Sequence, residues 1–182
     1  MISRTMAAKA VDPYAEALVS LASAQGLMDT FEADIRFMAA VLQATPELGQ
    51  FLASPLIKAE AKKNLLQQVF ADQIHPLLLN ALKLLSDRRR IMFLEAVCRR
   101  FLELQRKLQN IVLAEVTTAV PLTEAQQQSI RERVRDFTQA RGVELQIAQD
   151  PTLLGGVIIK IGSQVIDLSL RGQLRRLALQ LA

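Results

Sequence analysis

Residues 91–118 read IMFLEAVCRRFLELQRKLQNIVLAEVTT, and the spacing of the apolar residues changes within this stretch. As far as Leu108 they recur at helical intervals, which predicts a helix with one buried stripe. From Val112 to Thr118 every second residue is apolar or β-branched on one side, which is the period of a strand. The chain is therefore expected to pass from a helical part to a strand-containing part near Leu108.

Composition on either side of Leu108 supports this division. The first 108 residues contain ten valines and isoleucines, and the remaining 74 contain fourteen. Glycine follows the same trend, with two before Leu108 and five after it. Because β-branched residues favour strands and glycines favour tight turns, we expect an α+β protein with domains at 1–108 and 109–182.

The first domain is predicted to be a compact bundle of six helices with short connections. Three helix starts carry a capping residue followed by proline, namely Asp12-Pro13, Thr45-Pro46 and His75-Pro76. The expected helices run from Pro13 to Gln25, Met28 to Leu42, Pro46 to Ala53, Lys58 to Val69, Pro76 to Ser86–Arg90, and Ile91 to Leu108.

The second domain is predicted to have the order βαββα. Its first helix should open with a capping box formed by Thr123 and Gln126, bury Phe137, and end at Gly142. Gly162-Ser163 has the composition of a two-residue hairpin turn. The expected strands are Val112–Thr118, Val143–Ala148, Val157–Ile161 and Gln164–Asp167, and a last helix carries Leu170, Leu174, Leu177 and Leu181 on one face.

Few residues are available for chemistry. Cys98 and His75 are the only residues of their types, which excludes an internal disulfide and a multi-cysteine metal site. We expect Cys98 to be a small buried apolar residue, His75 to cap a helix or lie on the surface, and Gly155-Gly156 to form a structural turn. No apolar run approaches the length of a membrane span, and the N-terminus lacks the apolar core of a secretory signal. A mature cytoplasmic product without cofactor or metal is expected.

The charge balance leaves several partners open. Formal net charge is +4 and the isoelectric point is about 9.6, values that suit an acidic protein, a membrane surface or RNA. Arg88-Arg89-Arg90 is interpreted either as a solvated helix C-terminus or as a contact for nucleic acid or acidic lipid. A basic RNA- or ribosome-associated module therefore remains an alternative. A small enzyme that uses Asp150 or Asp167 with Arg171 is a weaker one, because no cluster of paired acids accompanies them.

The expected fifth helix has more apolar surface than a peripheral helix needs. Its apolar residues cover an arc of roughly 220°, whereas about 100° suffices for a surface helix. They are Leu77, Leu78, Leu79, Ala81, Leu82, Leu84 and Leu85. The first helix likewise has an apolar face and a face of small residues. The pattern fits central packing and a helix-binding groove equally well.

Several stretches resemble the delta-subunit family of F-type ATP synthases, which includes the mitochondrial oligomycin-sensitivity-conferring protein. Asp12-Pro13-Tyr14-Ala15-Glu16-Ala17-Leu18 is similar to the family's opening helix. The C-terminal signature is matched by residues 153–162, LLGGVIIKIG, by Val165-Ile166-Asp167 and by Ser169-Leu170-Arg171-Gly172-Gln173-Leu174. Its characteristic positions are Gly155, Gly156, Asp167 and Gly172. The match departs at Leu168, where the family commonly has glycine.

The resemblance implies a non-catalytic stator subunit that resists rotor torque. The first domain would bind the N-terminal helices of alpha subunits of the catalytic head between its first and fifth helices. The implied walls are Tyr14, Leu18 and Ala22 on one side and Leu78, Leu82 and Leu85 on the other.

The second domain would hold the b-type subunits of the peripheral stalk, with Arg171 and Arg175 as plausible contacts. A solvated face is an equally good interpretation of these two arginines. No nucleic acid is implied as a partner. The expected location is a membrane complex, joined indirectly, at the cytoplasmic face of a plasma membrane or the stromal or cytoplasmic face of a thylakoid.

Overall fold

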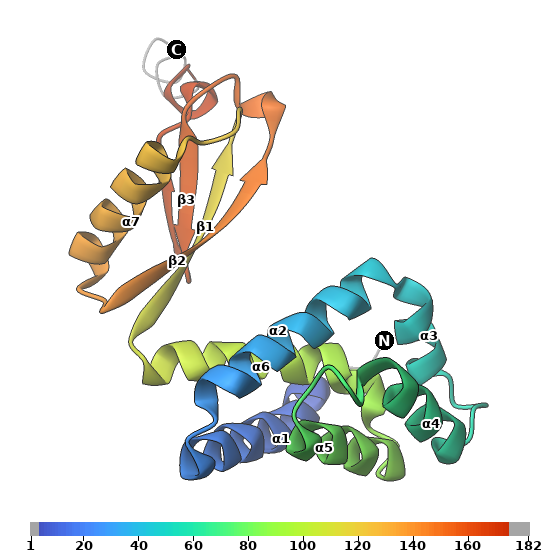
Figure 1. Ribbon diagram of the computed structural model, residues 1–182. Helices are drawn as coiled ribbons and strands as arrows, with labels where there is room; N and C mark the ends of the chain where they lie inside the picture. The colour runs from blue at the N-terminus through green and yellow to red at the C-terminus, as the bar shows by residue number, and fades with distance from the viewer. Residues whose placement is uncertain (1–3, 175–182) are drawn as a thin grey trace. The chain divides into compact units, whose positions relative to one another are not determined.

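The computed structural model describes residues 4–174 and divides the chain into two compact units. Unit 1 comprises Met1–Gln105 and unit 2 comprises Arg106–Ala182. The change in composition predicts a boundary after Leu108, and the structure places it in the last turn of the same helix. Helices and a four-stranded mixed sheet confirm the α+β class (Figure 1).

Unit 1 is built from α-helices and one short 3-10 helix, η1. Their bounds are α1 Arg4–Gln25, α2 Met28–Ala44, α3 Pro46–Ala53, α4 Ala59–Phe70, α5 Pro76–Asp87, η1 Ile91–Phe93 and α6 Leu94–Leu108. The expected start at Asp12-Pro13 is wrong, because α1 begins at Arg4 and Pro13 lies inside it. Pro13 is exposed, so the helix continues past it with the loss of one backbone hydrogen bond.

One hydrophobic core joins these helices. Phe31 of α2, Phe70 of α4 and Phe101 of α6 are completely buried within it. Cys98 lies in the same core, as expected, whereas Leu108 at the end of the predicted stripe is exposed. Aromatic side chains bury the largest apolar areas, so these three rings are the main packing contacts of unit 1.

His75 caps α5 as the sequence predicts. Its Nδ1 atom accepts a hydrogen bond from the backbone N–H of Leu77 at 3.2 Å. The backbone N–H of His75 donates to the carboxylate of Asp34 in α2 at 2.7 Å. Both contacts fix the position at which α5 begins, and Pro76 occupies its first turn.

Unit 2 contains a mixed sheet with the strand order β2-β1-β3-β4. The elements are β1 Ile111–Thr118, α7 Glu124–Thr138, β2 Gly142–Gln149, the 3-10 helix η2 Pro151–Leu153, β3 Val157–Ile161 and β4 Gln164–Asp167. A further helix begins at Leu170 and is described as far as Leu174. β1 is parallel to β2 and antiparallel to β3, and α7 lies against one face of the sheet (Figure 1).

The capping box at the start of α7 is confirmed, but its predicted end is wrong. Thr123 and Gln126 exchange the two expected hydrogen bonds. The left-handed residue that ends α7 is Gln139, with φ 54°, and its side chain donates to the Asp136 carbonyl. Gly142 instead begins β2, paired with Ile111.

Phe137 of α7, which is expected to be buried, is 58% exposed, so that prediction is wrong. Leu170 and Leu174, expected on one face of the last helix, are 48% and 58% exposed. Leu177 and Leu181 lie outside the described residues. The core of unit 2 is formed by Ala114, Val116, Val134 and Ile159 with their neighbours.

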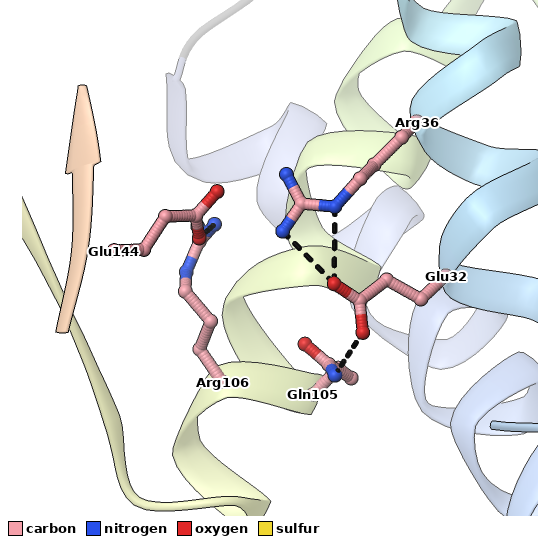
Figure 2. Close-up of polar contacts among 5 residues, drawn as sticks. All are labelled: Glu32, Arg36, Gln105, Arg106 and Glu144. Carbon is pink, nitrogen blue, oxygen red and sulfur yellow. Dashed lines mark hydrogen bonds and ion pairs between the residues drawn. The ribbon is translucent and has the colours of Figure 1, made fainter. Parts of the chain in front are cut away.

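Two successive residues of α6 make contacts within different units (Figure 2). Gln105, buried in unit 1, donates to the Glu32 carboxylate of α2 at 2.5 Å. Arg36 donates to the same carboxylate at 2.9 and 3.0 Å. In unit 2, Arg106 pairs with Glu144 of β2 at 3.1 Å. The boundary between the units therefore falls between Gln105, whose hydrogen bond lies in unit 1, and Arg106, whose ion pair lies in unit 2.

No helix among residues 4–174 combines the length and the apolar character needed to cross a membrane.

Candidate functional site

An apolar groove runs between α1 and α5 on the surface of unit 1. Its volume is about 320 Å³. The residues that line it are Tyr14, Ala17, Leu18, Leu21, Leu77, Asn80, Ala81, Leu84 and Leu85. Asn80 is the only side chain in this lining with an amide, so a bound helix would meet aliphatic and aromatic carbon along nearly the whole length.

Half of the residues expected in the groove walls line it. Tyr14, Leu18 and Leu85 do so. Ala22, Leu78 and Leu82 are absent from the lining, a correction to the expected walls, and their exposed fractions are 0%, 1% and 3%. They pack in the core of unit 1, because they lie on the inner faces of α1 and α5. Leu85 borders the groove but is itself only 2% exposed.

The groove is also lined by residues that were not expected in its walls, and those on α5 are sequence neighbours of the expected ones. On α5 they are Leu77, Ala81 and Leu84, spaced by four and three residues as one face of a helix requires. Leu84 is the most accessible leucine of α5, with 48% of its surface exposed. The wide apolar arc of α5 predicts a second apolar face besides the one in the core. The sequence alone does not determine which part of the arc packs in the core.

Arginines gather at the Tyr14 end of the groove. The guanidinium carbon of Arg90 lies 5.6 Å from the centroid of the Tyr14 ring, a cation–π contact. Arg88 ends α5, and Arg89 follows with φ 54°. All three arginines are exposed, and in the described part of the chain none of them pairs with an acid.

A second hollow of about 380 Å³ lies beside the connection from α3 to α4. Leu56, which is 91% exposed, and Met92 contribute its apolar surface. The ammonium of Lys62 donates to the carbonyls of Leu52 and Ser54 at 2.6 and 2.8 Å. This lysine satisfies the C-terminal carbonyls of α3, so its burial has a structural cause.

The four signature positions in unit 2 meet where the last helix begins. A side chain at Gly156, with φ 78°, would overlap the Leu168 carbonyl oxygen, and one at Gly155 would meet the Leu170 side chain at 2.8 Å. A Cβ at Gly172 would lie 2.5 Å from the Asp167 carboxylate.

Hydrogen bonds complete this arrangement. Asp167 accepts the backbone N–H and hydroxyl of Ser169 at 2.9 and 2.6 Å, and Ser169 accepts the N–H of Gly172 at 3.0 Å. The signature is therefore a structural junction, which agrees with the expected structural role of Gly155-Gly156. Leu168 keeps a negative φ, so the departure there needs no glycine.

Arg171 is exposed near this junction, and its guanidinium donates to the Thr152 hydroxyl at 3.1 Å. The Thr152 backbone and hydroxyl both donate to Asp150, which holds the pKa of that carboxyl below its ordinary value, with a smaller contribution from Arg171. Arg175 lies outside the described residues.

The acidic and thiol side chains that are candidates for catalysis have structural roles. Asp150 and Asp167 accept hydrogen bonds from their own turns, and burial raises the pKa of the Cys98 thiol to about 12. Within residues 4–174, no cluster of histidine, cysteine and carboxylate side chains could hold a metal ion.

Comparison with known proteins gives the family. The family model for the ATP synthase delta (OSCP) subunit matches residues 10–181. The chain belongs to that family. ATP synthase subunit delta of Synechococcus sp. (strain JA-3-3Ab) is 93% identical over 182 residues, which cover all of both chains. The corresponding subunit of Thermosynechococcus vestitus is 52% identical, covering all of this chain and 98% of the relative.

The fold of a solved structure agrees with this. A chain in the structure of the Toxoplasma gondii mitochondrial ATP synthase hexamer superimposes with a TM-score of 0.74 at 24% identity, covering 93% of this chain and 95% of that one. As a member of the delta (OSCP) family, the chain is a non-catalytic stator component of F-type ATP synthase. Other subunits of that complex are its partners, so the alternative of an RNA- or ribosome-associated module is set aside.

Proposed function

We propose that the chain connects the catalytic head of the ATP synthase to its peripheral stalk and thereby resists rotor torque. Residues 1–108, as a six-helix bundle, bind N-terminal helices of alpha subunits in the groove between α1 and α5. Residues 109–182, with the order βαββα, hold the b-type stalk subunits. Nucleotide and proton chemistry take place on other subunits.

The groove between α1 and α5 is the observation that carries the proposal. It presents accessible apolar surface on two adjacent helices: Leu84 of α5 is exposed, and Tyr14 and Leu18 of α1 are half-buried. An amphipathic helix buries its apolar face in such a groove, and about 25 cal/mol is gained per Å² of apolar surface removed from water. Ala17 and Ala81 leave room for the backbone of the bound helix to approach.

The surface around Arg171 supports a stalk contact in unit 2. Backbone hydrogen bonds join Leu170 to Gly155 and Leu168 to Val157, so the segments at 154–157 and 168–170 lie side by side. Their exposed leucines are Leu154, Leu168 and Leu170. Exposed apolar side chains beside a cation suit a partner helix with an apolar face and acidic flanks.

The proposed location follows from the complex. The chain is held at the membrane indirectly, at the cytoplasmic face of a plasma membrane or the stromal or cytoplasmic face of a thylakoid. Co-sedimentation with vesicles alone and with vesicles that carry the membrane sector would separate direct from indirect association.

Titration calorimetry against a peptide of the alpha subunit's N-terminal segment tests the head contact. We expect saturable one-to-one binding with a negative heat-capacity change, which is the signature of apolar burial. Absence of binding both to the peptide and to the intact catalytic head would refute the proposed role of the groove.

Leu84→Asp is the sharpest variant for this experiment. The change places a carboxylate in the apolar contact without removing a core side chain, so affinity should fall more than about tenfold. Leu56→Asp is the matched control, since Leu56 is even more exposed, lies in the same unit and does not line the groove. Equal affinities of the two variants would remove Leu84 from the contact.

For the stalk contact, Arg171→Ala should weaken binding of a soluble b-type fragment while leaving binding of the alpha peptide unchanged. Unchanged binding of the b-type fragment would favour the interpretation of Arg171 as part of a solvated face.

A further inference from the structure

The groove between α1 and α5 differs in charge at its two ends. α1 and α5 lie side by side and run in opposite directions (Figure 1). Arg90, which follows the end of α5, stacks on Tyr14 and marks one end of the groove. Leu21 and Leu77 mark the other, because they lie further along α1 and nearer the start of α5.

At the Tyr14 end the cations continue the apolar stripe of α5. Residues 77, 81, 84 and 88 are spaced by four, three and four, so Arg88 follows Leu77, Ala81 and Leu84 on one helical face. The backbone N–H groups of Arg88 and Arg90 donate to the carbonyls of Leu84 and Leu85, at 3.0 and 2.8 Å. These bonds hold the arginine segment against the last turn of the groove wall.

Acids near this end do not cancel the positive charge. Asp87 pairs with Lys63 of α4, and Asp12 pairs with Arg100 of α6. At 100° per residue, Glu16 lies about 140° to 160° around α1 from Tyr14, Leu18 and Leu21, and so on the far side of the helix from the groove. The cations of Arg88 and Arg90 thus remain available to a ligand in the groove.

The Leu77 end of the groove has acidic side chains nearby and no lysine or arginine in the adjoining segments of α1 and α5. Residues 19–27 contain no charged side chain, and residues 71–80 contain Asp72 as their only acid and neither lysine nor arginine. Asp34 of α2 also reaches this end, where it accepts the N–H of His75. A carboxylate on a bound helix would therefore be attracted to the Tyr14 end and repelled from the Leu77 end.

We propose that the groove is directional: it accepts an amphipathic helix with acidic residues in one terminal turn, and that turn lies against Arg88 and Arg90. This inference rests on the proposed function, because it assumes that a helix occupies the groove. The apolar contact supplies most of the affinity. The arginines select the orientation, since charge pairs at the rim of an interface determine register and partner choice.

A pair of synthetic peptides of about 18 residues tests the proposal on the full chain. Both have the same apolar stripe; one carries glutamates in a terminal turn and its twin carries glutamines there. A nitroxide label is attached at either end of each peptide. Because Cys98 is buried, it does not compete for the label.

The acidic peptide is expected to bind more tightly, by roughly three- to tenfold at low salt, and the difference should shrink as salt is added. A label at its acidic end should broaden the methyl signals of Leu84 more than those of Leu77, and a label at the other end should do the reverse. The glutamine peptide should show no such preference.

Variants separate the cations from the apolar surface. The double variant Arg88→Gln, Arg90→Gln should bind both peptides with the affinity of the glutamine peptide. Arg133→Gln removes the same type of charge from exposed α7 in unit 2 and should leave both affinities unchanged.

Two outcomes would overturn the inference in distinguishable ways. Equal affinities for both peptides, with equal broadening of Leu77 and Leu84, would mean that the groove binds helices without direction, and the proposed function would stand. Failure of every peptide and of the intact catalytic head to bind would overturn both the inference and the proposed function.

Discussion

His75, Asp150 and Asp167 each accept a backbone N–H from the residue two positions further along the chain. In each case the side chain precedes a helical segment and satisfies an amide that the helix leaves unpaired. These three residues are among the few whose side chains are candidates for catalysis. Because each of them caps a turn, it serves the local structure and does not form part of a reactive site.

Cys98 gives a prediction at the residue scale. Its thiol pKa of about 12 lies well above the value of about 8.5 in an unfolded chain, so the thiol stays neutral and covered in the folded protein. Maleimide at pH 8 should leave Cys98 unmodified in the native protein and modify it completely in guanidinium chloride, as read by mass spectrometry.

The raised pKa of Cys98 also makes the stability of the folded protein depend on pH. A raised pKa contributes stability that is complete below about pH 8.5 and declines as the pH rises toward 12. Cys98→Ala should therefore lose less stability than the parent between pH 8 and pH 10. Rapid native labelling or identical pH profiles would contradict the buried neutral thiol.

At the scale of elements, sequence patterns locate helices and strands well and assign faces poorly. The spacing of apolar residues and the proline and capping signals place α2 to α6, the start of α7 and all four strands close to their observed bounds. For α5, however, Leu78 and Leu82 contribute the same hydrophobicity to a helical wheel as Leu77 and Leu84. Only packing against α2, α4 and α6 decides which of them is buried.

Two other predictions, the start of α1 and the end of α7, are wrong because of an exposed proline and a glutamine in the left-handed conformation. A proline that follows aspartate is the usual signal of a helix start, yet Pro13 lies on the solvent side inside α1. Gln139 adopts the left-handed conformation that glycine usually supplies, with its amide bonded to the preceding turn. Neither choice is visible in the local sequence, because each depends on what surrounds the backbone.

The junction of β3 and the last helix gives a prediction at this scale. Gly156→Ala combines a left-handed φ with overlap of the Leu168 carbonyl, so unit 2 should lose about 1–3 kcal/mol of unfolding free energy. Gly49→Ala in α3 is the control. It has open space around the added methyl group and should gain about 0.5–1 kcal/mol. Denaturant unfolding monitored for each unit would detect both, and equal effects would contradict the close approach.

At the scale of the whole molecule, the two units have separate hydrophobic cores. The core of unit 1 extends from Val19 to Phe101, and that of unit 2 is centred on Ala114, Val134 and Ile159. The change in composition near Leu108 was sufficient to predict two parts. It could not fix the boundary, because α6 continues through it without a break in its helical pattern.

Leu82→Asp tests this separation. Leu82 is buried in the core of unit 1, so a carboxylate there should unfold unit 1 and abolish binding to the catalytic head. Unit 2 should keep its native amide spectrum and its slow hydrogen exchange. Simultaneous loss of the signals of both units would show that they unfold as one.

The pairing of β1 with β3 has a consequence for the order of folding. Ala114 must meet Ile161 across the whole of α7 and β2, whereas the helices of unit 1 form from residues close together in the chain. Contacts between distant residues form slowly, so unit 2 should acquire its native structure after unit 1, both in refolding and during synthesis from the N-terminus. The half that we propose binds the catalytic head would then be ready for assembly while the other half is still folding.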